Sequence, residues 1–341
     1  MNIQDIARLA GTSKSTVSRV LSNHPYVKEE TRQRVLEVID AYHYRPNAMA
    51  RGLANGSMSV IALLVSDVRN PFYTEMTWHI QQELNKRGYQ LFLCCSNYDA
   101  LMEKEFYALS SQYSFSGMIV VSLVDETQFL RAMDKLPCPV LLVNQKVEHF
   151  PGDVLVTDNY QAGYIAARHL IEQGHSKIAI ISCNQQNSSH RERRAGFISA
   201  LSAYNISLPP AYDFEYDYAI GGYDNKCGQR FYEEFMQMGS DAPTAVFCTA
   251  DIIAVSIIEV FRAAGHSVPE DLSVIGFDDI PFASLDSISL TTIRQPYAKI
   301  GRQAVDMILN RIENNPSGQQ MAIMDCELIV RGSTAKKATA K

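Results

Sequence analysis

The first 44 residues of the chain alternate short apolar faces with polar turns. Apolar side chains recur at helical spacing over residues 3–10, and Gly11 interrupts this run. A second helical run over 14–21 follows Ser13, a good N-cap residue, and a third covers 29–43. Two short helices joined by a glycine-containing turn predict a helix-turn-helix head over residues 1–46.

The stretch that follows the head has a different pattern. Residues 47–58 are too polar and too rich in glycine to hold a stable helix alone, although a weak helical period remains. We therefore expect a hinge or linker that becomes helical on a partner.

From Val60 onward, apolar strands alternate with amphipathic helices. The expected strands are 60–65, 90–95, 117–121, 139–143, 154–157, 177–182, 245–248 and 273–276. The expected helices are 73–87, 101–113, 128–136, 160–173, 191–204, 225–238, 252–264 and 297–313. Repeated βα units predict parallel sheets covered by helices on both faces, so the fold class is an all-α head plus an α/β domain. The segment from Val60 onward is longer than the segments that usually fold around a single hydrophobic core, which predicts two lobes.

The composition narrows the class of protein. Hydrophobic residues make up 46% of the 341 residues and charged residues 20%, as in ordinary globular proteins. No apolar run reaches the ~18 residues of a membrane span, and the N-terminus lacks a signal-peptide pattern. The seven cysteines, odd in number and without CxxC spacing, favour buried thiols in a reducing compartment over disulfides or a zinc site. We expect a cytoplasmic protein with no membrane partner and no metal.

Charge is distributed unevenly along the chain. The net charge is −6, yet residues 1–58 hold eight Lys or Arg and five acidic residues, which leaves +3 on this segment and −9 on the rest. A basic head on an acidic body is expected when only the head contacts phosphate.

The exposed face of the second predicted helix carries the chemistry of DNA recognition. Its side chains are hydroxyls and cations, and no acidic residue occurs from Gly11 to Val27. Hydroxyls suit phosphates and base edges, and arginine can bind guanine through two hydrogen bonds. The candidate DNA-contacting residues on this face are Lys14, Ser15, Thr16, Ser18 and Arg19.

Four motifs at matching spacing resemble the lactose-repressor (LacI/GalR) family of bacterial transcription regulators. They are Asp5–Gly11 (DIARLAG), Ser15–Leu21 (STVSRVL), Thr31-Arg32 and Tyr44–Asn47 (YRPN). The resemblance extends over essentially the whole chain. It implies that Lys14 and Ser15 select the operator, that Thr16 and Ser18 anchor phosphates, and that Arg19 contacts bases.

The resemblance also gives the hinge a role. Residues 47–55 would form a hinge helix that contacts DNA through Asn47, Ala50 and Leu53, with Leu53 wedged into the minor groove. One departure is Lys28, where the family usually has a serine that caps the third helix. This change removes on the order of 1 kcal/mol of capping and adds a cation near the DNA backbone.

For the body, the resemblance implies a two-lobed periplasmic-binding-protein fold over residues 59–334. The chain would cross between lobes near 174–175, 289–292 and 319–322. The N-lobe would then comprise about 59–173 and 292–320, and the C-lobe about 174–291 and 321–333. Residues 335–341 are expected to be disordered.

Ligands in such sheets lie at the carboxyl ends of the strands, where loops from both lobes meet. The candidate effector-binding residues at these ends are Asn70, Phe72, Tyr73, Asp158, Arg193, Tyr218, Asp251 and Asp278. By resemblance, Arg193 and Asp278 match regular effector contacts, whereas the spacing around Tyr218 looks one residue short. Carboxylates, an amide, an arginine and aromatics suit a polyhydroxylated ligand.

Several of these candidates have structural alternatives. Asp158 and Asp251 each stand at the start of a helix, where an N-cap role is equally consistent. Phe72 and Tyr73 could equally belong to the hydrophobic core of a lobe. Ala250 replaces a polar residue that many sugar-responsive members carry. The ligand is thus expected to be sugar-like, with a purine-like ligand, a phosphosugar or a protein co-regulator as alternatives.

These observations predict a repressor that binds a pseudo-palindromic operator as a homodimer and controls carbohydrate-utilisation genes. No leucine heptad follows Ser333-Thr334, so we expect dimers and not tetramers. An exported solute-binding protein would fit the body but not the basic head. An enzyme is disfavoured because the sequence lacks GxSxG, HExxH, P-loop and post-strand GxGxxG motifs, and we expect no catalytic residues and no cofactor.

Overall fold

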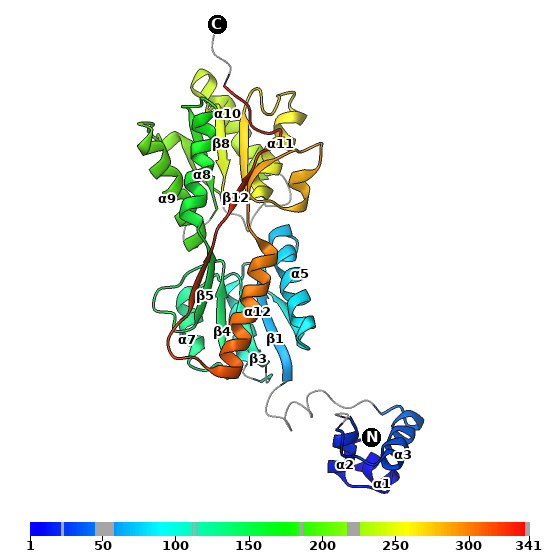
Figure 1. Ribbon diagram of the computed structural model, residues 1–341. Helices are drawn as coiled ribbons and strands as arrows, with labels where there is room; N and C mark the ends of the chain where they lie inside the picture. Colours follow the sequence, from blue (N-terminus) through cyan, green and yellow to red (C-terminus); the bar gives the residue numbers. More distant parts are fainter. Residues whose placement is uncertain are drawn as a thin grey trace. The chain divides into compact units, whose positions relative to one another are not determined.

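The computed structural model describes residues 1–21, 24–44, 58–110, 112–113, 115–183, 187–216 and 226–337. The chain forms two compact units, Met1–Ser59 and Val60–Lys341, which are drawn in Figure 1. The hinge candidates Asn47, Ala50 and Leu53 and the effector candidate Tyr218 lie outside the described residues.

The head consists of α1 (Ile3–Leu9), α2 (Lys14–Leu21) and α3 (Glu29–Ala41). A capping box starts α1, because the Asn2 side chain accepts from the Asp5 amide while the Asp5 carboxylate accepts from the Asn2 amide. Buried apolar residues from all three helices, among them Ile6, Val17 and Val35, form one small core. The predicted helix-turn-helix is confirmed.

The N-lobe of the second unit is built on a six-stranded sheet of order β11-β5-β4-β3-β1-β2. Its strands are β1 (Met58–Val65), β2 (Gln90–Cys95), β3 (Phe115–Val120), β4 (Val140–Val143), β5 (Asp153–Thr157) and β11 (Met321–Met324). Its helices are α5 (Pro71–Lys86), α6 (Ala100–Ser110), α7 (Glu126–Met133) and α12 (Tyr297–Asn314).

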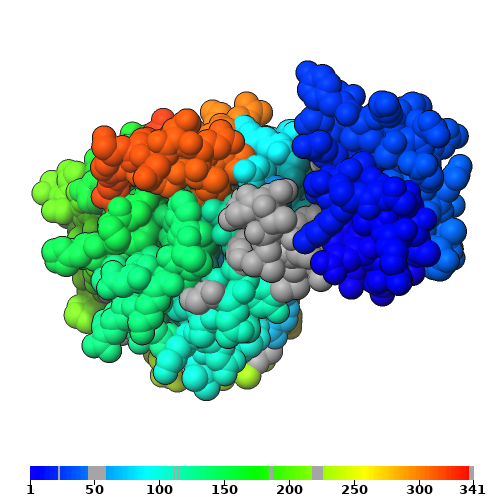
Figure 2. Space-filling view, turned by 90° about the horizontal axis from the view of Figure 1, so that it is seen from below, coloured from blue at the N-terminus to red at the C-terminus, as the bar shows by residue number. Residues whose placement is uncertain are grey.

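The side chains of β1 show why helices cover both faces of this sheet. Ile61, Leu63 and Val65 pack with α5 and α12, whereas Ala62 and Leu64 pack with α6 and α7. This alternation is the period of two expected for a strand. Figure 2 shows α12 (orange) along the side of this unit, beside the cyan residues of α5 that it contacts.

The C-lobe repeats this architecture on a sheet of order β12-β10-β9-β8-β6-β7. Its strands are β6 (Ile178–Ser182), β7 (Asp213–Glu215), β8 (Ala245–Cys248), β9 (Ser273–Asp278), β10 (Thr291–Arg294) and β12 (Glu327–Ile329). Its helices are α8 (Asn159–Glu172), α9 (Ser188–Ala203), α10 (Lys226–Met238) and α11 (Asp251–Ala263), with short 3-10 turns η1 (Pro210–Tyr212), η3 (Gly239–Asp241) and η4 (Pro281–Ser284). The strand β12 pairs antiparallel with β10, while β6, β8 and β9 pair in parallel. The two-lobed α/β fold with parallel sheets is confirmed.

The chain changes lobe at other points than predicted. Helix α8, assigned to the N-lobe by the boundary at 173, packs in the C-lobe, where Ala162, Ala166 and Leu170 contact the same core as Phe197. Strand β10 pairs with β9 in the C-lobe, and β11 pairs with β5 in the N-lobe. The boundaries at 173, 292 and 321 were therefore wrong, because an amphipathic pattern does not specify which sheet a helix or a short strand joins.

The C-terminal segment is more ordered than expected. The Lys337 amide donates to the carbonyl of Gln173 at 2.9 Å, and the Ala335 carbonyl accepts from the His175 imidazole at 3.0 Å. The expectation of disorder was thus wrong for 335–337, which dock on the C-lobe, and 338–341 lie outside the described residues. Among the helices that the structure describes, none has the length and apolar character needed to cross a bilayer.

Candidate functional site

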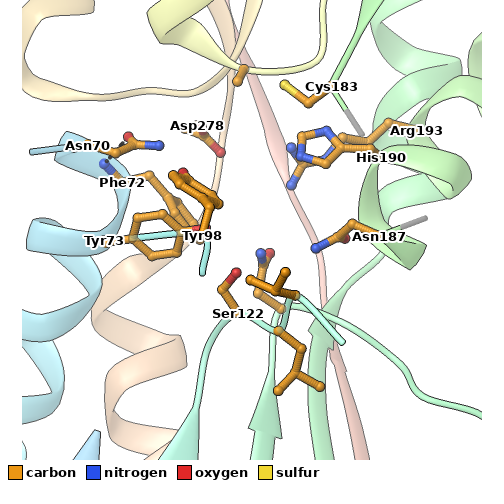
Figure 3. Close-up of a pocket in the computed structure, with 14 residues that line it drawn as sticks. Asn70, Phe72, Tyr73, Tyr98, Ser122, Cys183, Asn187, His190, Arg193 and Asp278 are labelled. Carbon is orange, nitrogen blue, oxygen red and sulfur yellow. Dashed lines mark hydrogen bonds between the residues drawn. The ribbon is translucent and has the colours of Figure 1, made fainter. Parts of the chain in front are cut away.

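A cavity of about 260 Å³ lies where carboxyl-terminal ends of strands from both lobes approach each other. Figure 3 shows that its labelled side chains come from both lobes and point toward one another. The N-lobe contributes Asn70, Phe72, Tyr73, Tyr98, Ser122, Leu123, Val124 and Asn144, and the C-lobe contributes Cys183, Asn187, His190, Arg193, Ala250 and Asp278. This location is the one expected for a ligand in open α/β sheets.

The N-lobe wall of the cavity is aromatic. The Asn70 side chain caps α5 by accepting from the Phe72 amide at 3.0 Å, which fixes the start of the helix. The rings of Phe72 and Tyr73 then meet edge to face at 4.9 Å. Burial raises the pKa of Tyr73, so its phenol stays neutral and can both donate and accept. Tyr98, after β2, adds a third ring to this wall.

The C-lobe wall carries a buried arginine held in one orientation. Arg193 on α9 donates from Nε to the Asn159 side chain at 2.8 Å and from one terminal nitrogen to the Thr249 carbonyl at 2.7 Å. Its guanidinium carbon lies 3.5 Å from the centre of the Phe277 ring. These contacts fix the plane of the guanidinium in advance, which suits recognition of a planar acceptor.

Asp278 stands at the end of β9 in a strained conformation. Its φ of 123° lies in a region that only glycine adopts readily, so this backbone conformation costs roughly 1–3 kcal/mol of folding free energy. The Gln295 amide donates to its carboxylate at 2.7 Å. Burial raises the pKa of Asp278 to about 7, although Arg193 and this hydrogen bond act in the opposite direction. A carboxyl that lines a cavity with a raised pKa and a strained backbone conformation is typical of a binding residue.

His190 lies beside Arg193 and is neutral. Burial, assisted by the Arg193 charge, lowers the pKa of the imidazole to about 3. Its Nδ1 is 3.1 Å from the hydroxyl of Thr249. The cavity therefore offers a neutral ring nitrogen as an additional hydrogen-bonding group.

The structure brings five of the predicted effector residues together, namely Asn70, Phe72, Tyr73, Arg193 and Asp278. Phe72 and Tyr73 also belong to the N-lobe core, so both of their expected roles coexist.

Two other predicted effector residues do not line the cavity. Asp158 caps α8 by accepting from the Gln161 amide at 2.9 Å. Asp251 is fully buried, where it accepts from the Ile280 amide at 2.9 Å and the Thr292 hydroxyl at 2.5 Å. The Asp251 carboxylate thus ties the loop after β9 to β10. Asp158 thus has the capping role that was its structural alternative, Asp251 has a different structural role, and the predicted effector role of both stays a prediction.

Sequence reasoning missed several lining residues. Ser122 and Asn144 follow β3 and β4, and Tyr98 follows β2, so the rule that polar residues at strand ends meet would have found them. Tyr98 and Asn144 also have positive φ values of 59° and 69°. Such backbone conformations are uncommon outside glycine and concentrate at functional sites.

The candidate DNA-contacting face of α2 is presented to solvent. Lys14, Ser15, Ser18 and Arg19 are exposed, whereas Val17 and Val20 on the opposite side are buried. The Ser13 hydroxyl accepts from the Thr16 amide at 3.1 Å and lies 2.8 Å from the Thr16 hydroxyl. The first turn of α2 is thereby fixed with its polar side chains outward.

Comparison with known proteins supports this architecture. A family model for bacterial regulatory proteins of the lacI family matches residues 2–47, and one for a periplasmic binding protein-like domain matches 167–334. The HTH-type transcriptional repressor PurR of Aliivibrio salmonicida is 32% identical over 98% of this chain and 99% of its own.

Two solved structures have the same fold. A lac repressor dimer bound to operator and the anti-inducer ONPF has a TM-score of 0.82 at 24% identity, covering 98% of this chain and 99% of the other. A regulator from Enterococcus faecium with bound ribose has a TM-score of 0.70 at 27% identity, covering 82% and 100%. Together with the helix-turn-helix and the interlobe cavity, the full-length likeness to PurR shows that this chain belongs to the LacI family of DNA-binding transcriptional repressors.

Proposed function

We propose that this chain is a homodimeric, cytoplasmic repressor whose operator affinity is set by one small planar nitrogen heterocycle, of the purine-base class, bound in the interlobe cavity. The observation that carries the proposal is the pairing of a rigid arginine and a titratable carboxyl in the C-lobe with three aromatic rings in the N-lobe. A flat ring stacks on aromatic faces, and its edge nitrogens and carbonyls match Arg193 and Asp278.

The size and polarity of the cavity favour this class over a large sugar. A volume of about 260 Å³ lies just below the ~300–1,000 Å³ of pockets that hold drug-sized ligands, so one or two fused rings fit better than a disaccharide. Ala250 adds an apolar patch where a hydroxyl partner would be expected for a sugar. The PurR relatives that match the chain end to end are consistent with a ligand outside the sugars.

A monosaccharide is the second candidate. It is favoured by the amides of Asn70, Asn144 and Asn187 and by the E. faecium relative with bound ribose. Amides bind neighbouring hydroxyls, and aromatic rings can stack on the C–H face of a sugar. This ligand would place the chain in control of carbohydrate-utilisation genes.

For the head, we propose that Lys14, Ser15 and Arg19 read base edges while Thr16 and Ser18 hold phosphates. Swapping Lys14 or Ser15 should change the preferred operator, whereas Thr16→Ala should weaken binding to every sequence alike. Arg19→Ala should cost roughly 1–3 kcal/mol at one base position. Asn47, Ala50 and Leu53 remain hinge contacts in this proposal.

Calorimetric titration of the full-length protein separates the two ligand classes. Hypoxanthine and guanine serve as purine probes, and ribose and glucose as sugar probes. We expect a purine probe to bind the wild type and to bind Asp278→Asn at least tenfold more weakly, because Asn cannot take up or release a proton. The control is Asp286→Ala, which removes an exposed C-lobe carboxylate. Sugar binding without purine binding would replace the first candidate by the second.

A further inference from the structure

A second cavity, distinct from the interlobe site, lies on the N-lobe between α6 and α7. It measures about 380 Å³ and is lined by residues of both helices and of the turns beside α7. These helices cover the sheet face opposite α5 and α12, and Figure 1 shows α7 on the far side of the sheet from α12. The residues that line this cavity are different from those that line the interlobe site.

The lining of this cavity is strongly basic. Lys104 comes from α6, and Arg131 and Lys135 come from α7 and the residues just after it. Asp125 is the one carboxylate in the described lining, which leaves an excess of two positive charges. That carboxylate is already engaged, because it caps α7 by accepting from the Gln128 amide at 2.8 Å. Within the described part of the chain, neither Lys104 nor Arg131 forms an ion pair.

Three cations line this one cavity. Lys104 comes from α6, whereas Arg131 comes from α7 and Lys135 from the turn after it, so an anion bound between the helices would meet three positive charges. Like charges so placed repel each other, and a bound anion removes this repulsion. The lining also has an apolar part, which consists of the buried ring of Tyr107 and the side chains of Ala108 and Ala132. The site thus combines an anion-binding rim with a surface for a carbon skeleton.

Hydrogen bonds between the two helices hold the cavity open in advance. The Gln128 side chain donates to the Ala100 carbonyl at 2.7 Å, which joins α7 to the start of α6. The fully buried Glu103 accepts from the Val124 amide at 2.9 Å, which fixes the segment that leads into α7. A preformed cavity binds its ligand without the cost of ordering its walls.

We propose that this cavity is a second ligand site and that it binds a small organic phosphate, with the phosphate on Lys104, Arg131 and Lys135 and the carbon skeleton over Tyr107. A phosphate matches the charge of the rim, and a sugar-sized skeleton fits a volume of about 380 Å³. Val124 lines the interlobe cavity and Asp125 lines this one, so the two sites share a continuous segment.

Isothermal titration of the full-length protein with glucose 6-phosphate, inorganic phosphate and glucose tests the site. We expect glucose 6-phosphate to bind more tightly than inorganic phosphate, and glucose not to bind here. The double variant Lys104→Gln/Arg131→Gln should weaken glucose 6-phosphate binding at least tenfold. The matched control Arg168→Gln/Lys299→Gln removes two exposed cations elsewhere and should bind as the wild type does. If both double variants bound glucose 6-phosphate equally weakly, net charge alone would explain the weaker binding, and the proposal would be overturned.

Hydrogen exchange locates the bound phosphate. Glucose 6-phosphate should slow amide exchange over 100–110 and 124–133 in the wild type and in Asp278→Asn alike, because the interlobe cavity is not involved. Protection confined to 70–73 and 187–197 would put the phosphate in the interlobe cavity and contradict a second site. Absence of binding at millimolar glucose 6-phosphate would also overturn it, without bearing on the interlobe ligand.

Discussion

The contact between α8 and α9 provides a sharp test of how the ligand site is positioned. A Cβ at Gly196 would lie 1.9 Å from the carbonyl oxygen of Tyr160, whereas ordinary contacts begin near 3.4 Å. The same approach occurs from the other side, where a Cβ at Gly163 would lie 2.0 Å from the Arg193 carbonyl oxygen. Substitution Gly196→Ala must therefore separate the two helices by about 1.5 Å at this point.

The size of the effect follows from two opposing contributions. Overpacking a closely packed contact costs typically ~1–3 kcal/mol. In the opposite direction, replacing a glycine within a helix by alanine stabilises the helix by up to ~1 kcal/mol. We expect Gly196→Ala to lower the free energy of unfolding by about 1–2 kcal/mol. Arg193 lies one turn before Gly196 and Asn159, which holds its Nε, begins α8, so the displacement should also weaken ligand binding.

Urea denaturation followed by circular dichroism measures the stability change, and titration with the purine or sugar probe that binds the wild type measures the binding change. The control is Ser202→Ala, an exposed site on the same helix, which should stay within ~0.5 kcal/mol of the wild type. If Gly196→Ala unfolded at the wild-type urea concentration and bound ligand equally well, the close approach of these helices would not be what positions Arg193.

Three further substitutions test local features. Because burial raises the pKa of Asp278 to about 7, the contribution of this carboxyl to the free energy of unfolding should fall as pH rises from 4 to 7, and Asp278→Asn should remove that contribution from a urea-measured profile. Burial lowers the pKa of His175, so the contribution of this imidazole to the free energy of unfolding should fall as pH drops below about 6.5, and His175→Gln should remove that contribution. A variant profile that matches the wild type would contradict the burial of His175 under the C-terminal segment. Lys28 is the N-cap residue of α3, and its side chain forms no capping hydrogen bond. Lys28→Ser should therefore raise the free energy of unfolding by ~1 kcal/mol and slow amide exchange in α3, and faster exchange would refute this.

The βα pattern was predictable because buried parallel strands appear as continuous apolar runs. All six residues of β3 and all five of β6 are buried, and such runs leave a clear signal. The strands β11 and β12 were not predicted, since they are three or four residues long, lie at sheet edges and are partly exposed. A short edge strand is defined by its partner, which lies far away in the sequence.

Asp278 was predictable because it ends the long strand β9, and Arg193, within α9, was predictable only from the resemblance to a family; both line the cavity. The partners of Asp251 could not be predicted, because they are an amide and a hydroxyl 29 and 41 residues away. His190 lacks any local signal, because its role depends on burial beside Arg193. Resemblance to a family supplied the lobes and the site, but the crossing points required the packing of α8 to be seen.

We propose that the interlobe ligand changes operator affinity because ligand and operator each favour one of two arrangements of the lobes. The most direct measurement is the affinity of the full-length protein for a selected pseudo-palindromic operator, by fluorescence anisotropy, with increasing concentrations of the purine or sugar probe that binds. A coupling of ~1–3 kcal/mol predicts a 5–150-fold change in operator affinity, and operator DNA must change the ligand affinity by the same factor. Asp278→Ala should bind operator as tightly as the ligand-free wild type and show no response. Operator affinity that stays constant at saturating ligand would contradict the account.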